Sequence, residues 1–310
     1  MQDGEYSKTA MGTAFMRAYH AAHARPPVFD DFLAQRLLTA EECLAAEERH
    51  LKALNLFDPA QAASCPDRAG ALACWMQSAG APAIVLARAR YAEDLLEEAV
   101  RQGLKQYVIL GAGMDTFAWR RPDLLAGLQV FEVDHPDTQA HKRQRLREAG
   151  LEPPARLNFL PVDFGQDNLG AALKRSAYDP QAPTFFSWLG VTYYLPRDAV
   201  SATWRAITAA APSGSAVIFD YLDTDAFVPG RVSRRVEIMM EIVRRVGEPM
   251  VTGFVPATLA ADLARLGLRL QENLSPADIQ DRFFQGRTDG YHACEHAHFA
   301  RAVVAYHDPE

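Results

Sequence analysis

The sequence predicts an α/β fold, and three observations along the chain support this prediction. Residues 107–110 form an apolar run with the length of one buried strand. The run ends at Gly111-Ala112-Gly113, where two residues without a Cβ atom let a ligand approach the backbone. A second run, residues 128–133, ends at Asp134. Strand, glycine turn, helix, strand and acid are typical of a nucleoside-binding unit, in which the acid accepts hydrogen bonds from ribose.

The sequence of the turn argues against two kinds of nucleotide-binding site. A dinucleotide-binding turn has a third glycine or alanine where this chain has Thr116, so a dehydrogenase is disfavoured. No glycine-lysine pair followed by serine or threonine is present, so the turn is not a nucleotide-triphosphate loop. A glycine turn alone also fits an ordinary tight turn, but the second strand that ends in an acid favours nucleoside binding.

Composition and charge describe a globular chain without a nucleic-acid partner. Apolar residues make up 49% of the 310 residues and charged residues 23%, which is typical of a packed protein. The formal net charge of −7 argues against nucleic-acid binding, because such domains carry a basic face. The arginines within residues 231–235 and 244–245 are interpreted as the solvated face of a charged helix.

Three features predict a cytoplasmic protein that does not bind or span a membrane. The four cysteines include no C-x-x-C pair, which favours reduced and mostly buried thiols. The first residues, MQDGEYSKT, are polar and show no signal peptide. No apolar run approaches the roughly 20 residues that a membrane helix needs.

The first hundred residues are predicted to be helical. Residues 1–25 have an amphipathic pattern that ends at Pro26-Pro27. A capping signal at Thr39 divides the helical pattern of residues 30–56. A longer helix is expected over residues 68–98, with an interruption near Gly80-Ala81-Pro82. Residues 1–103 are therefore expected to form an N-terminal helical cap.

The remaining elements alternate between helices and strands. Further strands are expected at residues 156–161, 184–187, 216–221, 268–274 and 299–306. Helices are expected at residues 135–150, 196–211, 231–246 and 259–266, and a polar and aromatic loop at residues 275–291. The strand at 184–187 is expected beside the first strand, so that its end opens on the crevice where such sheets bind ligands.

An insertion interrupts the sheet pattern after the fifth strand. Its apolar residues at helical spacing are Val236, Met239, Met240 and Val243. A methionine pair on such a stripe fits an ordinary core. Because the insertion would hang over the strand ends, residues 223–256 are also interpreted as a substrate lid, with Gly247 and Gly253 as hinges.

The segments around the glycine turn resemble the leucine carboxyl methyltransferase family. The resemblance lies in LGAGMDTFAWR followed by VFEVDHP, and extends to SKTA, ARARYAEDLL, PVDF and PTFFSWLGVTYYLP, over most of residues 7–222. It implies a Rossmann-like seven-stranded methyltransferase sheet with an antiparallel last strand, and S-adenosyl-L-methionine (SAM) as cofactor. It further implies a single domain over residues 1–310, with the core sheet in residues 104–222 and 257–310.

The resemblance also implies the cofactor contacts. An arginine of the last cap helix would pair with the methionyl carboxylate of SAM. Arg88 and Arg90 are two residues apart and cannot share a helix face, and Arg90, which precedes the aromatic residue, is the one predicted to do so. A salt bridge from Arg90 to Glu93 or Asp94 is the alternative. The full predicted set is Lys8, Arg90, Gly111, Ala112, Gly113, Asp134, Asp163, Phe164 and Leu189.

Three of these residues have particular interpretations. Asp163 and Phe164 would contact adenine, through the exocyclic amine and the ring face, although Asp163 also fits a helix cap. Leu189 stands where the family usually has a glutamate that contacts the cofactor. This departure weighs against methylation of a protein carboxylate and little against SAM binding.

The candidate catalytic residues are His292, His296 and Tyr193. Either histidine could act as general base for a hydroxyl acceptor, and Tyr193 could line the reaction centre or simply pack. His292, Cys294, His296 and His298 would share one face of a strand. This spacing is unlike that of structural zinc sites, so no metal is predicted.

The predicted function is that of a SAM-dependent O-methyltransferase acting on a carboxylate or hydroxyl of a small molecule, as in secondary metabolism. The alternatives are a protein C-terminal carboxyl methyltransferase and a non-catalytic SAM-binding regulatory protein. A carboxylate acceptor needs no base and would instead favour a cation such as Arg17 or Arg287. The protein is expected to be a monomer or a homodimer.

Overall fold

The computed structural model describes residues 6–305 and contains one seven-stranded sheet. The strands are β1 (Gln106–Leu110), β2 (Gln129–Asp134), β3 (Leu157–Pro161), β4 (Thr184–Trp188), β5 (Ala216–Leu222), β6 (Leu268–Leu274) and β7 (Ala297–Val304). Their order is β3-β2-β1-β4-β5-β7-β6. Strands β1 to β5 are parallel, and β7 runs antiparallel to both of its neighbours. The predicted fold class, including the antiparallel last strand, is confirmed.

The order of the strands fixes where a ligand can bind. The chain runs from β1 outward to β2 and β3, and then returns to β4 on the other side of β1. The loops that follow β1 and β4 therefore leave the sheet in opposite directions and open a crevice between them. The predicted neighbour relation of the first and fourth strands is confirmed by the pairing of Gln106 with Thr184.

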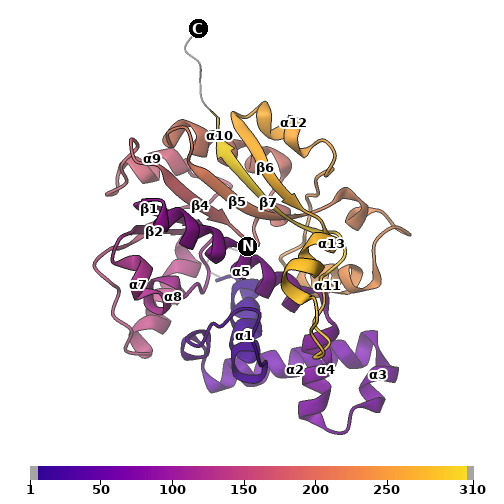
Figure 1. Cartoon of the computed structure of the whole chain (residues 1–310). Coiled ribbons are helices and arrows are strands. Elements are labelled where there is room, and N and C mark those ends of the chain that lie inside the picture. Colours follow the sequence, from indigo (N-terminus) through magenta and orange to yellow (C-terminus); the bar gives the residue numbers. More distant parts are fainter. Residues whose placement is uncertain (1–5, 306–310) are drawn as a thin grey trace.

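Helices precede the sheet and connect its strands (Figure 1). The helices are α1 (Lys8–His23), α2 (Ala40–Phe57), α3 (Pro59–Ser64), α4 (Arg68–Ser78), α5 (Gly80–Arg101), α6 (Phe117–Arg120), α7 (Pro122–Leu125), α8 (Pro136–Glu148), α9 (Leu169–Lys174), α10 (Arg197–Ala210), α11 (Arg234–Arg245), α12 (Leu259–Ala264) and α13 (Pro276–Ile279). In Figure 1, α1 to α4 gather below the sheet, and α11 lies at the right between them and the sheet.

The capping signal at Thr39 is confirmed. The Thr39 side chain accepts a hydrogen bond from the backbone of Glu42, and the Glu42 carboxylate accepts one from the backbone of Thr39. The helix predicted before this cap is wrong, since only a 3-10 turn, Ala34–Leu37, forms there. The predicted interruption near Gly80 is confirmed, because α4 ends at Ser78 and α5 begins at Gly80.

Other predicted bounds agree with the structure within a few residues, with one difference. The loop predicted at 275–291 contains α13 and a π-helical turn, Gln280–Phe284. Ser275 starts this segment with a capping box to Asp278, a local signal that outweighs its polar composition. The end of the predicted last strand at residue 306, and residues 1–5 of the predicted cap, lie outside the described residues.

The sheet divides the core into two layers. Tyr107 and Ile109 of β1 pack into one layer, and Val108 and Leu110 pack into the other, as the alternation of side chains along a strand requires. Helix α5 contributes Ile84 to the first layer. This layer also includes residues of α11, so α5 is held between the sheet and α11.

The sequence also predicted reduced thiols and no apolar run long enough for a membrane helix. All four cysteines are free, and Cys294 is buried while the other three are half-buried. Within residues 6–305, no single helix has the length and apolar character to cross a bilayer. Helices α4 and α5, which are bent by 61° at their junction, reach that length and apolar character only when they are taken together. Eleven residues of α5 are buried, as in a core helix.

Stability is expected to fall in acid because of His20, which is fully buried. Its Nε2 accepts a hydrogen bond of 2.8 Å from the Val28 amide, and burial, followed by the nearby Arg287, lowers its pKa from 6.5 to about 4. Between these two pH values the His20 side chain is protonated in the unfolded state but not in the folded state. The free energy of unfolding is therefore expected to fall by on the order of 3 kcal/mol as the pH falls from 6.5 to 4. His20→Gln, which keeps an acceptor for Val28, is expected to flatten this part of a urea-unfolding pH profile, and an unchanged slope would contradict the assignment.

Candidate functional site

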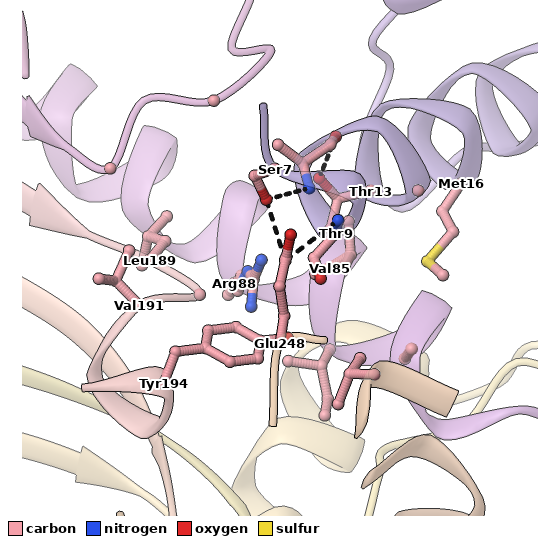
Figure 2. Close-up of a pocket in the computed structure, with 18 of the residues that line it drawn as sticks. Ser7, Thr9, Thr13, Met16, Val85, Arg88, Leu189, Val191, Tyr194 and Glu248 are labelled. Carbon is pink, nitrogen blue, oxygen red and sulfur yellow. Dashed lines mark hydrogen bonds between the residues drawn. The ribbon is translucent and has the colours of Figure 1, made fainter. Parts of the chain in front are cut away.

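A cavity of about 880 Å³ lies at the carboxyl ends of β1, β2 and β4. The strand ends form its floor, and α1, α5 and α11 contribute to its walls. In the close-up of Figure 2, Leu189 and Val191 lie on one side, Met16 on the other, and Arg88 and Glu248 between them. The cavity therefore lies where the strand order predicts a crevice, and the N-terminal helices and the insertion at residues 223–256 both contribute to its walls.

The glycine turn after β1 forms one edge of this cavity. Gly111 has a φ of +72°, and a Cβ atom there would lie 2.4 Å from Cγ2 of Val191. Gly113 has a φ of +51°. Both glycines therefore occupy backbone conformations that other residues rarely adopt. Gly111, Ala112 and Gly113 all line the cavity, as predicted.

Asp134 lines the cavity at the end of β2 and holds the glycine turn in place. One carboxylate oxygen accepts a hydrogen bond from the Gly113 amide, and the other accepts one of 2.7 Å from the His135 amide. Burial raises the pKa of Asp134, although these two backbone bonds act in the opposite direction. The acid thus links the ends of β1 and β2 and can accept further bonds from a ligand, because each carboxylate oxygen has two lone pairs.

The prediction for Arg90 is corrected by the structure. Arg90 is exposed and pairs with Asp94, one turn further along α5, at 2.7 Å. Arg88 lines the cavity instead. The argument that the two arginines cannot share a helix face is correct, but the orientation of α5 was unknown from the sequence and the wrong arginine was chosen. The alternative of an exposed salt bridge, considered for Arg90, describes that residue.

Arg88 belongs to a buried polar network with Asp220 and Tyr193. Its Nη1 donates to the Tyr193 hydroxyl at 2.6 Å and to Asp220 Oδ2 at 3.0 Å. Burial acts to lower the pKa of Arg88, but the Asp220 carboxylate outweighs it, so the net shift is upward and the guanidinium stays charged. A cation is thereby fixed in a largely apolar cavity with nitrogen atoms left to meet a carboxylate.

Gly190 supports this network from the loop after β4. Its amide donates to Asp220 Oδ1 at 2.6 Å, and a Cβ atom on Gly190 would lie 2.3 Å from Nη2 of Arg88. The arginine therefore packs directly on this glycine. Asp220 was missed by the sequence analysis, although an acid inside the apolar strand AVIFDYL is a signal that could have found it.

Four further predicted cofactor contacts, Lys8, Asp163, Phe164 and Leu189, also line the cavity. The Phe164 ring packs on Trp188 with a centroid distance of 6.3 Å. Asp163 accepts a hydrogen bond of 2.8 Å from the Gly165 amide. The alternative role of Asp163 as a helix cap is wrong, because Asn168 caps the next helix, α9. The structure thus brings together all predicted cofactor contacts except Arg90.

A carboxylate from the loop after α11 lines the cavity at the start of α1. Figure 2 shows Glu248 pointing at Ser7 and Thr9. Glu248 accepts hydrogen bonds from the Ser7 hydroxyl at 3.0 Å, from the Lys8 amide at 2.8 Å and from the Thr9 amide at 3.2 Å. The Lys8 and Thr9 amides lie in the first turn of α1, where a negative charge is favourable. No local pattern predicts this contact, because Ser7 and Glu248 are 241 residues apart.

The three predicted catalytic residues are not equivalent in the structure. Tyr193 lines the cavity, but burial raises the pKa of its hydroxyl well above 10, so it does not act as a base at neutral pH. His292 lines the cavity from an exposed position, with Nδ1 2.9 Å from the Gly290 carbonyl oxygen. His296 lies outside the lining, and its Nδ1 is 2.9 Å from Asp223 while Nε2 accepts from the Ser233 amide.

The expected strand face of histidines does not form. β7 begins only at Ala297, and His296 has a φ of +65°, so residues 292–296 lack the strand alternation. Within residues 6–305, no group of three or more histidine, cysteine or acidic side chains is arranged to hold a metal ion. Of the cations proposed for a carboxylate acceptor, Arg17 lines the cavity and pairs with Asp31, whereas Arg287 pairs with Asp289 outside the lining.

Comparison with known proteins agrees with the geometry. The family model of the leucine carboxyl methyltransferases matches residues 10–208. YktD of Bacillus subtilis (strain 168), assigned as an S-adenosyl-L-methionine-dependent methyltransferase, is 37% identical over 310 residues, which cover 98% of this chain and 99% of YktD. A relative from Mycobacteroides abscessus with the same assignment is 30% identical over 270 residues, which cover 87% of this chain and 80% of the relative.

Solved structures share the fold at low sequence identity. A DUF574-family protein of Streptomyces avermitilis has a TM-score of 0.55 at 14% identity and covers 94% of this chain and 96% of its own. A protein of Thermobifida fusca, assigned as a methyltransferase, has a TM-score of 0.53 at 15% identity and covers 83% of this chain and 94% of its own.

Proposed function

This chain belongs to the leucine carboxyl methyltransferase family and is a SAM-dependent methyltransferase, and we propose that it methylates an oxygen of a small molecule, a carboxylate or a hydroxyl. The observation that carries the proposal is the cavity of about 880 Å³ in which the glycine turn, Asp134 and Arg88 meet an apolar wall. Its size is that of a small-molecule site rather than of a protein-binding surface.

The cavity fits the cofactor in its chemistry. The glycine turn leaves space beside the ends of β1 and β2, and Asp134 offers acceptors to ribose hydroxyls. Asp163 and Phe164 are our candidates for the adenine, with Leu189 as an apolar neighbour. Arg88 replaces Arg90 as the partner of the methionyl carboxylate, because its guanidinium is charged and lines the cavity. When bound, SAM supplies the sulfonium methyl group.

The residues that surround the acceptor favour one that is already ionised. Tyr193 is held as a neutral phenol by burial and donates or accepts hydrogen bonds within the Arg88 network. His296 lies outside the cavity lining. Of the three residues predicted as catalytic, only His292 remains a candidate base. A carboxylate is ionised at neutral pH and needs no base, which supports a carboxylate or an acidic phenol over an aliphatic alcohol.

Calorimetric titration of the purified protein with SAM, S-adenosylhomocysteine and, as control, NAD tests the cofactor. Micromolar binding of the two sulfur nucleosides and none of NAD is the expected result. Transfer of a labelled methyl group to a panel of small carboxylic acids and phenols then tests the acceptor. A labelled protein band in cell extract, without any labelled small molecule, would overturn the small-molecule proposal in favour of a protein carboxyl methyltransferase. SAM binding without any transfer would favour a regulatory protein.

The lid interpretation of residues 223–256 gives a separate prediction. Met239 on α11 is buried and lines the cavity. Met239→Trp is expected to raise the KM for the acceptor at least tenfold, since a larger side chain fills the acceptor space, and to leave SAM affinity within about twofold. Kinetics and calorimetry on the same preparation check this. If only the midpoint of thermal unfolding falls, α11 is plain core and the lid interpretation fails.

A further inference from the structure

The end of the cavity away from the strands is an apolar chamber. We define it by six lining residues that also pack in one apolar cluster, namely Met16, Ala53, Phe57, Trp75, Ile238 and Ile242. They come from four elements, α1, α2, α4 and α11, so the cap and the lid meet here. Met16 marks this side in Figure 2, opposite Leu189 and Val191. Of the predicted cofactor contacts, only Lys8 shares an element, α1, with the residues of this chamber.

One histidine interrupts the apolar lining of this chamber. His50 lies on α2, lines the cavity and is half-buried. Its ring stacks against Phe15 at a centroid distance of 5.5 Å and an interplanar angle of 23°. The Trp75 indole nitrogen donates a hydrogen bond of 2.9 Å to His50 Nδ1. Two aromatic neighbours thus fix both the plane of the imidazole and its rotation.

The bond from Trp75 also fixes the tautomer of His50. An indole nitrogen is a donor only, so Nδ1 of His50 must be the acceptor and cannot carry a proton. In a neutral imidazole the proton is then on Nε2. Burial, followed by the nearby Arg49, lowers the pKa of His50 to about 4, which keeps the ring neutral at physiological pH. His50 is therefore a fixed hydrogen-bond donor.

We propose that the apolar chamber is the acceptor subsite and that Nε2–H of His50 donates a hydrogen bond to an oxygen of the bound acceptor. The acceptor class that this fits is a largely apolar small molecule with a carbonyl, carboxylate or ether oxygen besides the oxygen that receives the methyl group. His50 is a specificity-determining residue in this assignment, and the inference rests on the proposed function.

The geometry excludes His50 as a general base. A base would have to take a proton at Nδ1 or at Nε2. Nδ1 already accepts from Trp75, and Nε2 already carries a proton, so a second proton would set two N–H groups against each other at 2.9 Å. A donor to the methylated oxygen itself would also reduce its nucleophilicity. The bond therefore belongs on a different oxygen, and its contribution is to positioning.

The test uses two probes that differ by one carbonyl oxygen, 1-tetralone and tetralin, on the full chain saturated with S-adenosylhomocysteine. Dissociation constants are measured by quenching of tryptophan fluorescence, to which Trp75 contributes from within the chamber, and by ligand-observed NMR. Tetralin is the more hydrophobic probe, so the two dissociation constants differ for reasons besides the hydrogen bond. The quantity compared between variants is therefore the ratio of the two dissociation constants. The variants are His50→Phe, which keeps a planar ring without a donor, and His50→Gln, which keeps an N–H donor. His23→Phe, at an exposed histidine outside the cavity lining, is the matched control.

The preference for the ketone is expected to fall about fivefold or more in His50→Phe, as for the loss of one hydrogen bond. His50→Gln is expected to retain at least part of it, and His23→Phe all of it. Calorimetry with S-adenosylhomocysteine checks that each variant still binds the cofactor product. If the wild type itself does not bind S-adenosylhomocysteine, the proposed function is overturned. An unchanged ratio in His50→Phe overturns the role of His50. If that variant does not fold, an unchanged ratio in His50→Leu, which also lacks a donor, overturns it. Failure of both probes to bind the saturated wild type overturns the chamber as an apolar subsite.

Discussion

Arg88→Ala is expected to weaken SAM binding by about 10- to 100-fold. Arg88 is a buried cation of the cavity, with its side chain 11% exposed, and the variant would lose a charge-assisted bond to the methionyl carboxylate. The change also leaves Asp220 buried without its cation, which is expected to cost about 3 kcal/mol of folding free energy. Calorimetry and urea unfolding measure the two effects separately.

Two controls separate the role of Arg88 from general damage. Arg90→Ala removes an exposed pair with Asp94 and is expected to change neither affinity nor stability by more than about 0.5 kcal/mol. 5′-Methylthioadenosine lacks the amino-acid portion of SAM, so its affinity is expected to be the same in Arg88→Ala and in the wild type. Equal losses for SAM and for methylthioadenosine would show that Arg88 supports the cavity as a whole rather than the carboxylate.

Asp134→Ala is expected to weaken SAM binding by about 1–3 kcal/mol, through loss of the ribose acceptor. The structure adds a second reason, because the Asp134 carboxylate also holds the amides of Gly113 and His135. Methylthioadenosine contains the ribose, so its binding is expected to weaken as much as that of SAM, in contrast to Arg88→Ala. Calorimetry with both ligands checks this.

Asp134→Asn is the matched variant for this site. Asparagine keeps the shape and one acceptor oxygen, so an intermediate loss of affinity is expected. If Asp134→Ala binds SAM as well as the wild type does, the acid serves only to hold the glycine turn and the ribose assignment is wrong.

The fold could be predicted from the sequence because each strand, helix cap and turn is encoded by residues that are close together in the chain. The apolar run of β1, the capping box of Thr39 and Glu42, and the glycines at positions 111 and 113 each depend on a few neighbouring residues. The sequence failed where a stronger local signal was overlooked, as at Ser275, whose capping box starts a helix in a segment that was predicted to be a loop.

The part of the site that the sequence predicted reliably is the glycine turn and Asp134, which directly follow β1 and end β2. The two arginines on α5 show the limit, because spacing says that Arg88 and Arg90 face different ways but not which of them faces the sheet. That choice is made by the packing of α5 in the core layer that it shares with Tyr107 of β1 and with the lid.

What the sequence by itself determined is the family, the order of the elements and the residues that follow β1 and β2. Only the tertiary structure decided that Asp220 and Gly190 hold Arg88, that Glu248 closes on the start of α1, and that Trp75 fixes the tautomer of His50. The physical reason is the same in each case. A hydrogen bond depends on distance and direction in space, and its partners here come from separate elements, from 25 residues apart for Trp75 and His50 to 241 for Ser7 and Glu248.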